Sequence, residues 1–169
     1  MREGLQRQKR TARVRGDHAL GIFLALICMP ALAADFAGRV VSVHDGDTLT
    51  ALVGRTEFKI RLAEIDAPEL RQPFGQRSRD SLAELCFQKQ AHLVPVDRDR
   101  YGRTVARVEC DGVDANREQV RRGMAWVFLR YASPSSPLHS VQSEAQSGRT
   151  GLWSEPGAVP PWEWRKETR

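Results

Sequence analysis

The chain has 169 residues and a formal charge of +5, a length that suits one domain preceded by a removable segment. Residues 1–34 hold six basic and two acidic residues, which leaves 20 basic and 19 acidic residues, a net charge of +1, for residues 35–169. A near-neutral chain excludes the binding of polyanions through overall charge. Any contact with phosphate must therefore come from individually placed arginines.

Residues 1–34 have the order of a secretory signal peptide. A basic region ends near Arg15, an apolar run covers residues 19–28, and residues 30–34 supply small side chains in an A-x-A pattern. The alternative is an uncleaved membrane anchor, but the apolar span contains a proline and is shorter than the ~20 residues of a spanning helix. We expect cleavage after Ala33 or, as a second choice, after Ala34. The protein is then exported, to the periplasm or the medium, and has no contact with a membrane once the signal is cleaved.

The rest of the chain, residues 35–169, is predicted to be a single domain of short strands and helices. β-branched residues, alternation and tight turns predict five strands, over residues 36–44, 47–53, 56–65, 91–97 and 104–110. Apolar periodicity and capping residues predict three helices, over residues 75–87, 115–122 and 138–147. Five short strands with a helix inserted after the third predict an α+β, mainly β fold: a five-stranded OB-fold barrel flanked by three helices.

The tail, residues 154–169, is rich in Trp and Pro. Residues 160–165 could form a proline-rich ligand motif for another protein. We favour the other interpretation, in which the tail lies over the barrel and buries its tryptophans.

Cys86 and Cys110 are the two cysteines that remain once residues 1–34 are removed. An even pair in an exported protein predicts a disulfide, and the alternative is two buried thiols. Two cysteines without a nearby histidine do not make a zinc site, and the four histidines of the chain form no cluster with ligand spacing.

Three short motifs place charged residues at the ends of predicted strands. They are Asp45-Gly46-Asp47, the stretch from Arg61 to Glu69 that contains Asp66, and Tyr101-Gly102-Arg103. Each motif alone is commonly a turn or a surface charge. Together they hold what hydrolysis of a phosphodiester needs: a cation to offset charge that develops on the phosphate oxygens, fixed donors to those oxygens, and a base that acts on water.

The residue types suggest how these tasks are divided. Asp47 and Asp66 can supply hard oxygen ligands to Ca²⁺, with a backbone carbonyl and water completing the shell. Arg61 and Arg103 can each grip phosphate oxygens in bidentate fashion, which lysine cannot do. Glu69 can act on the attacking water.

These motifs resemble the three signature segments of the staphylococcal nuclease (thermonuclease) family. The matching stretches are residues 43–48, 61–69 and 99–103, in the family's order and approximate spacing, and residues 123–125 and 151–153 match as well. The resemblance covers about residues 36–155. It implies an OB-fold barrel with three helices and calcium-dependent cleavage of DNA and RNA. In-line attack of water would break the bond to the 5′ oxygen and leave 3′-phosphate ends.

The resemblance also implies roles for individual residues. Asp47, Asp66 and the backbone carbonyl of Ala67 would hold Ca²⁺, and Asp45 would lie behind them and order water beside the ion. Ala67 replaces a threonine that is common in the family, but a carbonyl ligand survives that change.

The same resemblance implies that Arg61 and Arg103 clamp the reacting phosphate and that Glu69 orients or deprotonates water. The loop after Glu69 is shorter than in the best-known member, which also lacks the paired cysteines.

Further positions of the family touch the substrate beyond the reacting phosphate. Arg100 and Tyr101 match positions that contact the neighbouring phosphate, and Tyr131 matches an aromatic position near the base. Leu129 stands where the best-known member has a tyrosine that flanks the base, so stacking on the base is weakened here.

Two other functions compete with a nuclease. One is a non-catalytic OB module that binds nucleic acid or protein. Such modules in this family commonly lose catalytic residues, whereas this chain keeps all five that the motifs supply: Asp47, Arg61, Asp66, Glu69 and Arg103. A near-neutral domain is also a poor stand-alone binder of nucleic acid. The other is a barrel whose carboxylates are only surface charges. We expect an exported, monomeric, calcium-dependent nuclease with DNA and RNA as substrates.

Overall fold

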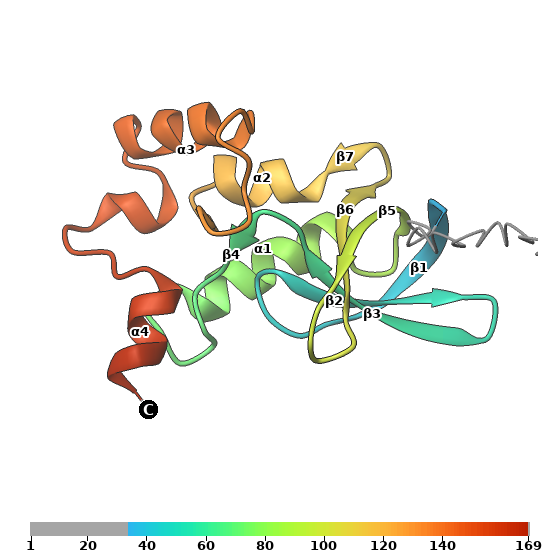
Figure 1. Ribbon diagram of the computed structural model, residues 1–169. Coiled ribbons are helices and arrows are strands. Elements are labelled where there is room, and N and C mark those ends of the chain that lie inside the picture. The colour runs from blue at the N-terminus through green and yellow to red at the C-terminus, as the bar shows by residue number, and fades with distance from the viewer. Residues whose placement is uncertain (1–33, 169) are drawn as a thin grey trace, which may run out of the picture. The chain divides into compact units, whose positions relative to one another are not determined.

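Five strands form a closed barrel in the computed structural model, which describes residues 34–168 (Figure 1). Hydrogen bonds join them in the order β3-β2-β1-β5-β6, and a parallel pairing of β3 with β6 closes the barrel. The strands are β1 (Phe36–Val43), β2 (Thr48–Val53), β3 (Thr56–Leu62), β5 (Gln90–Arg98) and β6 (Thr104–Cys110). This architecture confirms the predicted α+β fold with its OB-type barrel. The predicted signal peptide lies outside the described residues, apart from its last residue.

The barrel interior is filled by side chains that alternate along the strands. In β6, Ala106, Val108 and Cys110 are buried, whereas the residues between them are exposed. β5 alternates in the same way as far as Pro95, after which a bulge shifts its register against β6. A bulge suits Pro95, because proline cannot donate a ladder hydrogen bond. Large buried aliphatic side chains from β1, β2, β3, β5 and β6 form the core: Val40, Leu49, Ile60, Leu62, Leu93 and Val108.

The third strand is shorter than the predicted range of residues 56–65. β3 ends at Leu62, and Glu64 takes a positive φ of 63°, which turns the chain out of the barrel. Residues Ile65–Asp66 form a separate short strand, β4, which pairs with β8 (Trp126–Val127). The prediction was wrong here because β-branched and apolar residues continue through the turn, so the sequence shows no break. The consequence is that Asp66 lies on a second sheet.

The side chain of Glu64 is held by residues from β6 and from the segment before α3. It accepts hydrogen bonds from Arg107 and Ser136. Partial burial raises the pKa of its carboxyl, but these hydrogen bonds and the charges of Arg107 and His139 outweigh burial and lower the pKa below its usual value. Glu64 therefore links the turn after β3 to the segment before α3.

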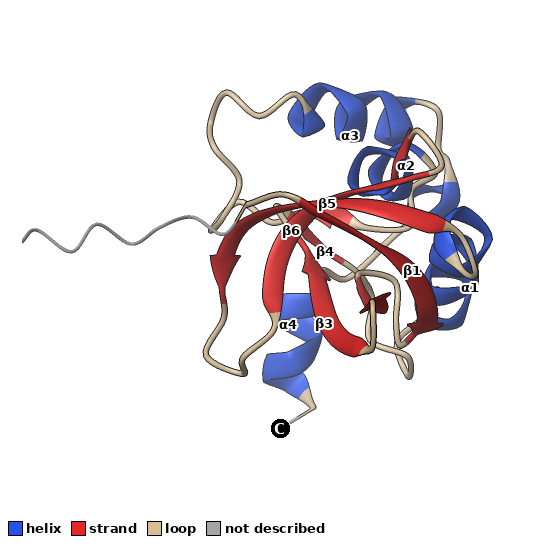
Figure 2. Ribbon diagram, turned by 90° about the vertical axis from the view of Figure 1, so that its right-hand side faces the viewer, coloured by secondary structure: helices blue, strands red, loops and turns tan. Residues whose placement is uncertain are grey.

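The three predicted helices are present with nearly the predicted bounds, and a fourth follows them. They are α1 (Gly75–Cys86), α2 (Ala115–Arg121) and α3 (Leu138–Ser147), with α4 (Pro161–Glu167) in the tail. Asp114 caps α2 by accepting a hydrogen bond from the backbone N–H of Arg117, as its position predicts. A short strand β7 (Val113–Asp114) and a 3₁₀ turn η1 (Gly151–Ser154) complete the elements. Figure 2 shows that α4 lies apart from α2 and α3.

The tail packs against the domain, as we favoured, but in a form that the sequence did not reveal. Trp153 meets Trp126 edge to face with ring centroids 5.3 Å apart. Trp162 stacks on Phe128 at 5.3 Å with an interplanar angle of 8°. Trp162 and Trp164 of the tail are only partly buried, and Pro161, the first residue of α4, is the buried residue of that helix. The prediction of three flanking helices therefore missed α4, because a seven-residue helix rich in Trp and Pro has no clear apolar periodicity.

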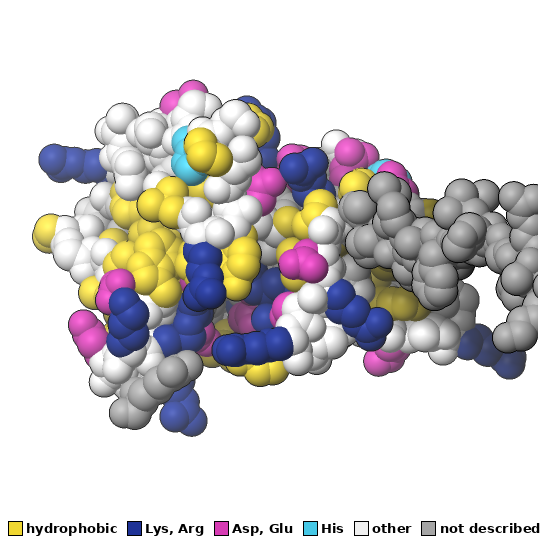
Figure 3. All heavy atoms as spheres, viewed as in Figure 1, with side chains coloured by type: hydrophobic (Ala, Val, Ile, Leu, Met, Phe, Trp, Pro, Cys, Tyr) yellow, Lys and Arg dark blue, Asp and Glu magenta, His cyan; other side chains and the backbone are white. Residues whose placement is uncertain are grey.

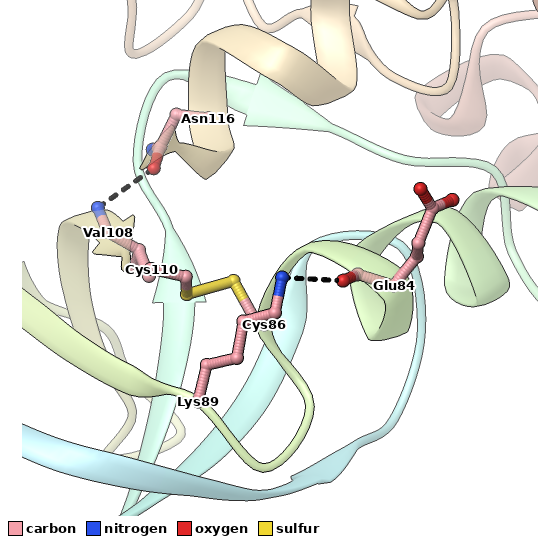
Figure 4. Close-up of a disulfide and its surroundings, with 6 residues drawn as sticks. All are labelled: Glu84, Cys86, Lys89, Val108, Cys110 and Asn116. Atoms are coloured by element: carbon pink, nitrogen blue, oxygen red, sulfur yellow. Dashed lines mark hydrogen bonds between the residues drawn. A yellow bond between two sulfur atoms is a disulfide. The ribbon is translucent and has the colours of Figure 1, made fainter. Parts of the chain in front are cut away.

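Cys86 and Cys110 form the predicted disulfide, with their Cα atoms 5.3 Å apart (Figure 4). The bond joins the last residue of α1 to the last residue of β6, and both cysteines are fully buried. Close by, the side chain of Asn116 in α2 accepts a hydrogen bond from the backbone N–H of Val108 at 2.9 Å. The bridge thus ties a covering helix to a barrel strand.

Within residues 34–168, each helix is too short or too polar to cross a membrane.

Candidate active site

Strand pairing at one end of the barrel brings the predicted charged motifs together. Thr48, at the start of β2, pairs with Arg61 on β3. The parallel pairing sets Ile60 beside Thr104, so Arg103, which directly precedes β6, lies next to the end of β3. The Nη1 atom of Arg103 is 3.5 Å from the Thr48 hydroxyl. Residues from three segments that are distant in sequence therefore share one end of the barrel.

The Asp45-Gly46-Asp47 turn fits tightly between β1 and β2. Asp45 accepts a hydrogen bond from the backbone N–H of Asp47 at 3.0 Å. A Cβ atom at Gly46 would overlap the hydroxyl oxygen of Ser78 and lie 2.8 Å from the Cβ of Ala67. Only glycine leaves room for this approach, so the turn has a fixed position against α1.

Gln119 of α2 also holds this turn in place, and the sequence analysis did not predict it. Its Nε2 atom donates to the carbonyls of Gly46, at 2.7 Å, and Ser78, at 3.0 Å. The side chain is fully buried. The available signal was a polar residue on the apolar face of a predicted helix, since Ala115 and Val120 on that helix are also buried.

Asp47 is buried, and both oxygens of its carboxylate have partners. Its Oδ2 atom accepts a hydrogen bond from the backbone N–H of Ala67 at 2.7 Å and lies 3.1 Å from Nη1 of Arg61. Its Oδ1 atom accepts from the Thr48 hydroxyl at 2.9 Å. These contacts place Asp47 directly beside the residues that follow β3.

The guanidinium of Arg61 is held in one orientation by its own end of the sheet. Nη1 donates to the carbonyls of Leu62 and Ile65, at 3.1 and 2.9 Å, and Nη2 donates to Oδ1 of Asp66 at 3.0 Å. The side chain is only 14% exposed. A guanidinium fixed in this way is already oriented before any ligand arrives.

The carboxylates at this end of the barrel sit in an environment that disfavours their charge. Burial raises the pKa of Asp66 above its usual value, and the lowering effect of hydrogen bonds from Arg165 does not fully offset it. Burial and the adjacent charge of Asp47 raise the pKa of Asp45 to about 7. A group of close, poorly solvated carboxylates is suited to a cation.

Arg103 is held by an Asx-type loop in front of β6. Its Nε donates to Oδ2 of Asp99 at 2.6 Å, and Oδ1 of Asp99 accepts from the backbone N–H groups of Tyr101 and Arg103. Partial burial alone would raise the pKa of Asp99, but these hydrogen bonds lower it. The guanidinium lies 5.7 Å from the ring centroid of Tyr101. Arg100 donates to the Tyr101 hydroxyl, so the predicted substrate contacts of this loop are together.

Exposed side chains flank the charged group. Tyr101, Leu129 and Tyr131 expose 70%, 68% and 64% of their surface, which is unusual for large apolar or aromatic residues. Tyr131 packs edge-on against Phe128. Phe128 directly follows β8, and β8 pairs with β4, the strand that contains Asp66. No hydrogen bond or ion pair among residues 34–168 joins Tyr131 to the carboxylates. Tyr131 is thus connected to the segment of Asp66 through Phe128 and β8 and not by a hydrogen bond or ion pair of its own.

Glu69 lies on the turn that follows β4, and its carboxylate contacts a residue that sequence reasoning missed. Arg165 of α4 donates through Nη1 to Oε1 of Glu69 at 2.7 Å, and through Nη2 to Oδ2 of Asp66 at 2.6 Å. Although burial disfavours the charge of Arg165, these hydrogen bonds raise its pKa. Nothing in the sequence links Arg165 to a carboxylate 99 residues away, because the link depends on the unpredicted α4.

The surface view shows how these groups are arranged on one face of the molecule. Lys and Arg side chains gather between α4 and the barrel strands, and acidic side chains are recessed among them (Figure 3). An apolar area adjoins this basic region. Such a surface suits an extended anionic ligand with both phosphates and flat apolar groups.

The predicted metal ligands are two carboxylates and one carbonyl, not a cluster of side chains. No group of three or more His, Cys, Asp or Glu side chains within residues 34–168 could hold a metal ion. Asp47 and Asp66 both contact Arg61, so their carboxylates face a common space. The carbonyl of Ala67 accepts no hydrogen bond from the described residues, whereas its N–H is bonded to Asp47. Three oxygen donors of this kind fit a hard cation.

Comparison with known proteins identifies the family. Residues 59–155 match the family model described as staphylococcal nuclease homologue. The chain belongs to the staphylococcal nuclease family. It is therefore a nuclease that hydrolyses phosphodiester bonds, its substrates are nucleic acids, and its family works with a metal ion. This confirms the family and the enzyme class that the motifs predicted.

Several bacterial nucleases of the family are similar over most of their length. A micrococcal nuclease of Shigella flexneri is 39% identical, covering 85% of this chain and 88% of that protein. An uncharacterized endonuclease of Escherichia coli O157:H7 is 42% identical, covering 85% and 94%. One of Haemophilus influenzae is 42% identical, covering 78% and 74%. The residues matched by the family model include Arg61, Asp66, Glu69 and Arg103, but end before α4 and Arg165.

Proposed function

We propose that this nuclease is calcium-dependent and hydrolyses both DNA and RNA by in-line attack of water, leaving 3′-phosphate ends. The observation that supports this most is the contact of Arg61 with both Asp47 and Asp66 at one end of the barrel. Two buried carboxylates that share one guanidinium, with a second arginine just before the adjacent strand, form a site where a cation and a phosphate can lie side by side.

Asp47, Asp66 and the carbonyl of Ala67 would hold the calcium ion. When bound, the ion offsets the negative charge that develops on the phosphate oxygens. Asp45 hydrogen-bonds to the backbone of Asp47 and so lies directly behind the ligands, where it can order water. Burial and the charge of Asp47 raise the pKa values of Asp45 and Asp66, which favours this proposal, since a divalent cation stabilises the charged form of both carboxyls.

Arg61 and Arg103 bind the reacting phosphate from two sides. Arg61 is held by backbone carbonyls and Arg103 by Asp99, so neither guanidinium has to reorganise as charge grows on the phosphate oxygens. Glu69 accepts a proton from the attacking water. The electron pair of the phosphorus–oxygen bond leaves with the 5′ oxygen, which takes up a proton, and the phosphate stays on the 3′ side.

The exposed side chains beside the charged group position the nucleic-acid strand on either side of the reacting phosphate. Arg100 and Tyr101 lie on the loop that carries Arg103 and contact the neighbouring phosphate. Tyr131 stacks near a base. Leu129 offers no aromatic face, so discrimination between bases is weak.

The domain organisation follows the same proposal. Residues 1–34 are a cleaved signal peptide, and residues 35–169 form one exported, monomeric domain. The disulfide supports export, because such bonds persist in oxidising compartments.

The test uses the mature protein from residue 35 with supercoiled plasmid and with RNA, each with calcium or with a chelator. We expect both substrates to be degraded only with calcium, and the products to carry 3′-phosphates. Glu69→Gln, Arg61→Ala and Arg103→Ala should each lose activity by orders of magnitude while keeping the circular dichroism of the parent. Arg121→Ala is the matched control, since Arg121 is exposed and pairs with Glu118 on the same helix.

Two results would contradict the proposal. A folded protein that degrades neither substrate with any of several divalent metals would be a binding module. Full turnover in Glu69→Gln would remove the role of Glu69 as the base.

A further inference from the structure

Within its own turn, Glu69 is held through its backbone and not through its carboxylate. Only a residue from another part of the chain can fix the position of the carboxylate. Glu69 lies in a turn, with its backbone carbonyl accepting from the N–H of Gln72 and its N–H donating to the side chain of Gln72. The side chain is 43% exposed. Its carboxylate has one hydrogen-bond partner among residues 34–168, and that partner is Arg165.

Arg165 joins this exposed carboxylate to a fixed one. Nη1 lies 2.7 Å from Oε1 of Glu69 and 3.3 Å from Oδ1 of Asp66, while Nη2 lies 2.6 Å from Oδ2 of Asp66. The side chain of Asp66 is 2% exposed and is bound by Arg61 as well. A planar guanidinium that spans two carboxylates sets the distance and angle between them, which a lysine ammonium cannot do.

The helix that carries Arg165 is anchored at two points, one in α4 and one just before it. Trp162 stacks on Phe128, which follows β8, the strand that pairs with β4. At the second point, Gln72 donates to the carbonyl of Val159, just before α4, at 2.6 Å. The residue that fixes the backbone of Glu69 therefore also fixes the approach of α4.

We propose that Arg165 is a positioning residue of this nuclease: it holds the carboxylate of Glu69 beside Asp66, where the attacking water must lie. This rests on the proposed function, in which Glu69 takes the proton from that water. α4 lies beyond the residues matched by the family model, so this part of the site comes from a segment outside that match.

Two other roles for Arg165 lead to different measurements. It could bind substrate phosphate directly, or it could compete with the metal ion for Asp66. Positioning is preferred as its main role because Arg165 also donates to Glu69, which is not a proposed metal ligand, and is the one hydrogen-bond partner of that carboxylate among residues 34–168.

A double-mutant cycle between Glu69 and Arg165 is the test, measured on mature protein with plasmid DNA and calcium. We expect Arg165→Ala to lower kcat by ~10–100-fold with little change in KM, because a displaced base slows the chemical step. Glu69→Gln and the double variant should have the same low kcat, since Arg165 acts through Glu69. Arg165→Lys should recover only part of the loss. Lys166→Ala is the control on the same helix, because Lys166 is exposed and pairs with Glu163, and it should leave kcat unchanged.

A second measurement separates positioning from effects on folding or on the metal site. Arg165→Ala should still unfold at a higher temperature when calcium is added, which shows that the ion still binds the native state. Loss of this calcium response would overturn the proposal, since Arg165 would then be needed to build the metal site. If Arg165→Ala does not fold, Arg165→Gln and Arg165→Lys carry the same test.

The remaining outcomes each decide between the alternatives. A raised KM with unchanged kcat would assign Arg165 to phosphate binding, and a lower calcium requirement with unchanged kcat would assign it to competition with the ion. Additive losses in the double variant would also overturn positioning. If Glu69→Gln is inactive but Arg165→Ala is fully active, only this inference fails. If Glu69→Gln is fully active, the proposed role of Glu69 as the base fails with it.

Discussion

The disulfide gives the most direct prediction of stability. Reducing Cys86–Cys110 in the intact protein removes the cross-link but leaves both sulfur atoms in place. For a separation of 24 residues, the chain-entropy relation gives a loss of about 3 kcal/mol in the free energy of unfolding. In a domain of this size that loss corresponds to a fall of roughly 10 °C in the melting temperature.

Urea unfolding of the oxidised and the reduced protein measures this difference. Cys86→Ala with Cys110→Ala should lose about 1 kcal/mol more than reduction does, because both fully buried sulfur atoms are removed. This double variant should not respond to reductant, which makes it the control. Equal unfolding free energies for the oxidised and the reduced protein would refute the reasoning.

Reduction should leave cleavage unchanged at temperatures where the protein stays folded. The bridge lies at Cys110, and Arg103 lies just before the other end of the seven-residue strand β6, ~20 Å away. A loss of activity without a loss of folded protein would show that the bridge also shapes the site.

Three further predictions follow from particular residues. Gly46→Ala should lower stability by about 1–3 kcal/mol and abolish cleavage, since a Cβ there would overlap Ser78; an unchanged melting temperature would contradict this. Asn116→Ala should cost about 2–4 kcal/mol in urea unfolding, because a buried backbone N–H and a buried carbonyl each lose their partner; a loss below 1 kcal/mol would mean that water replaces the amide. The pKa of Glu64 is lowered on folding, so its contribution to stability is present above the unfolded pKa of about 4.3 and is lost as the pH falls through the lower folded value. Glu64→Gln should therefore be less stable than the parent near pH 7, and the two should converge in acid; an equal difference at every pH would contradict the assignment.

The barrel and most of its helices could be predicted from the sequence because each carries a local signal. Alternation marks the strands. Asp114, which caps α2, and Gly123, which takes a positive φ just after it, mark the ends of that helix. The end of β3 could not be predicted, because the positive φ of Glu64 is a property of how the turn packs and not of its residue type. The α+β class and the OB-type barrel were therefore predictable, while the second sheet was not.

The charged residues of the site could be predicted for a similar reason, since each motif is short and continuous. Arg165 and Gln119 could not be predicted in the same way. Their partners are 96 to 99 and 41 to 73 residues away, so their contacts exist only once α4 and α2 are docked. Sequence motifs thus reveal the groups proposed to meet the substrate more readily than the groups that support them.

The parallel pairing of β3 with β6 links folding to the onset of activity. These strands are distant along the chain, so their pairing must overcome the entropy of closing a long loop and belongs among the slower steps of folding. Arg61 and Arg103 come together in that same step. A chain whose barrel is still open holds every proposed phosphate ligand but no site, and so is inert toward nucleic acid. Refolding followed by cleavage and by amide exchange of β3 and β6 should therefore give one and the same rate.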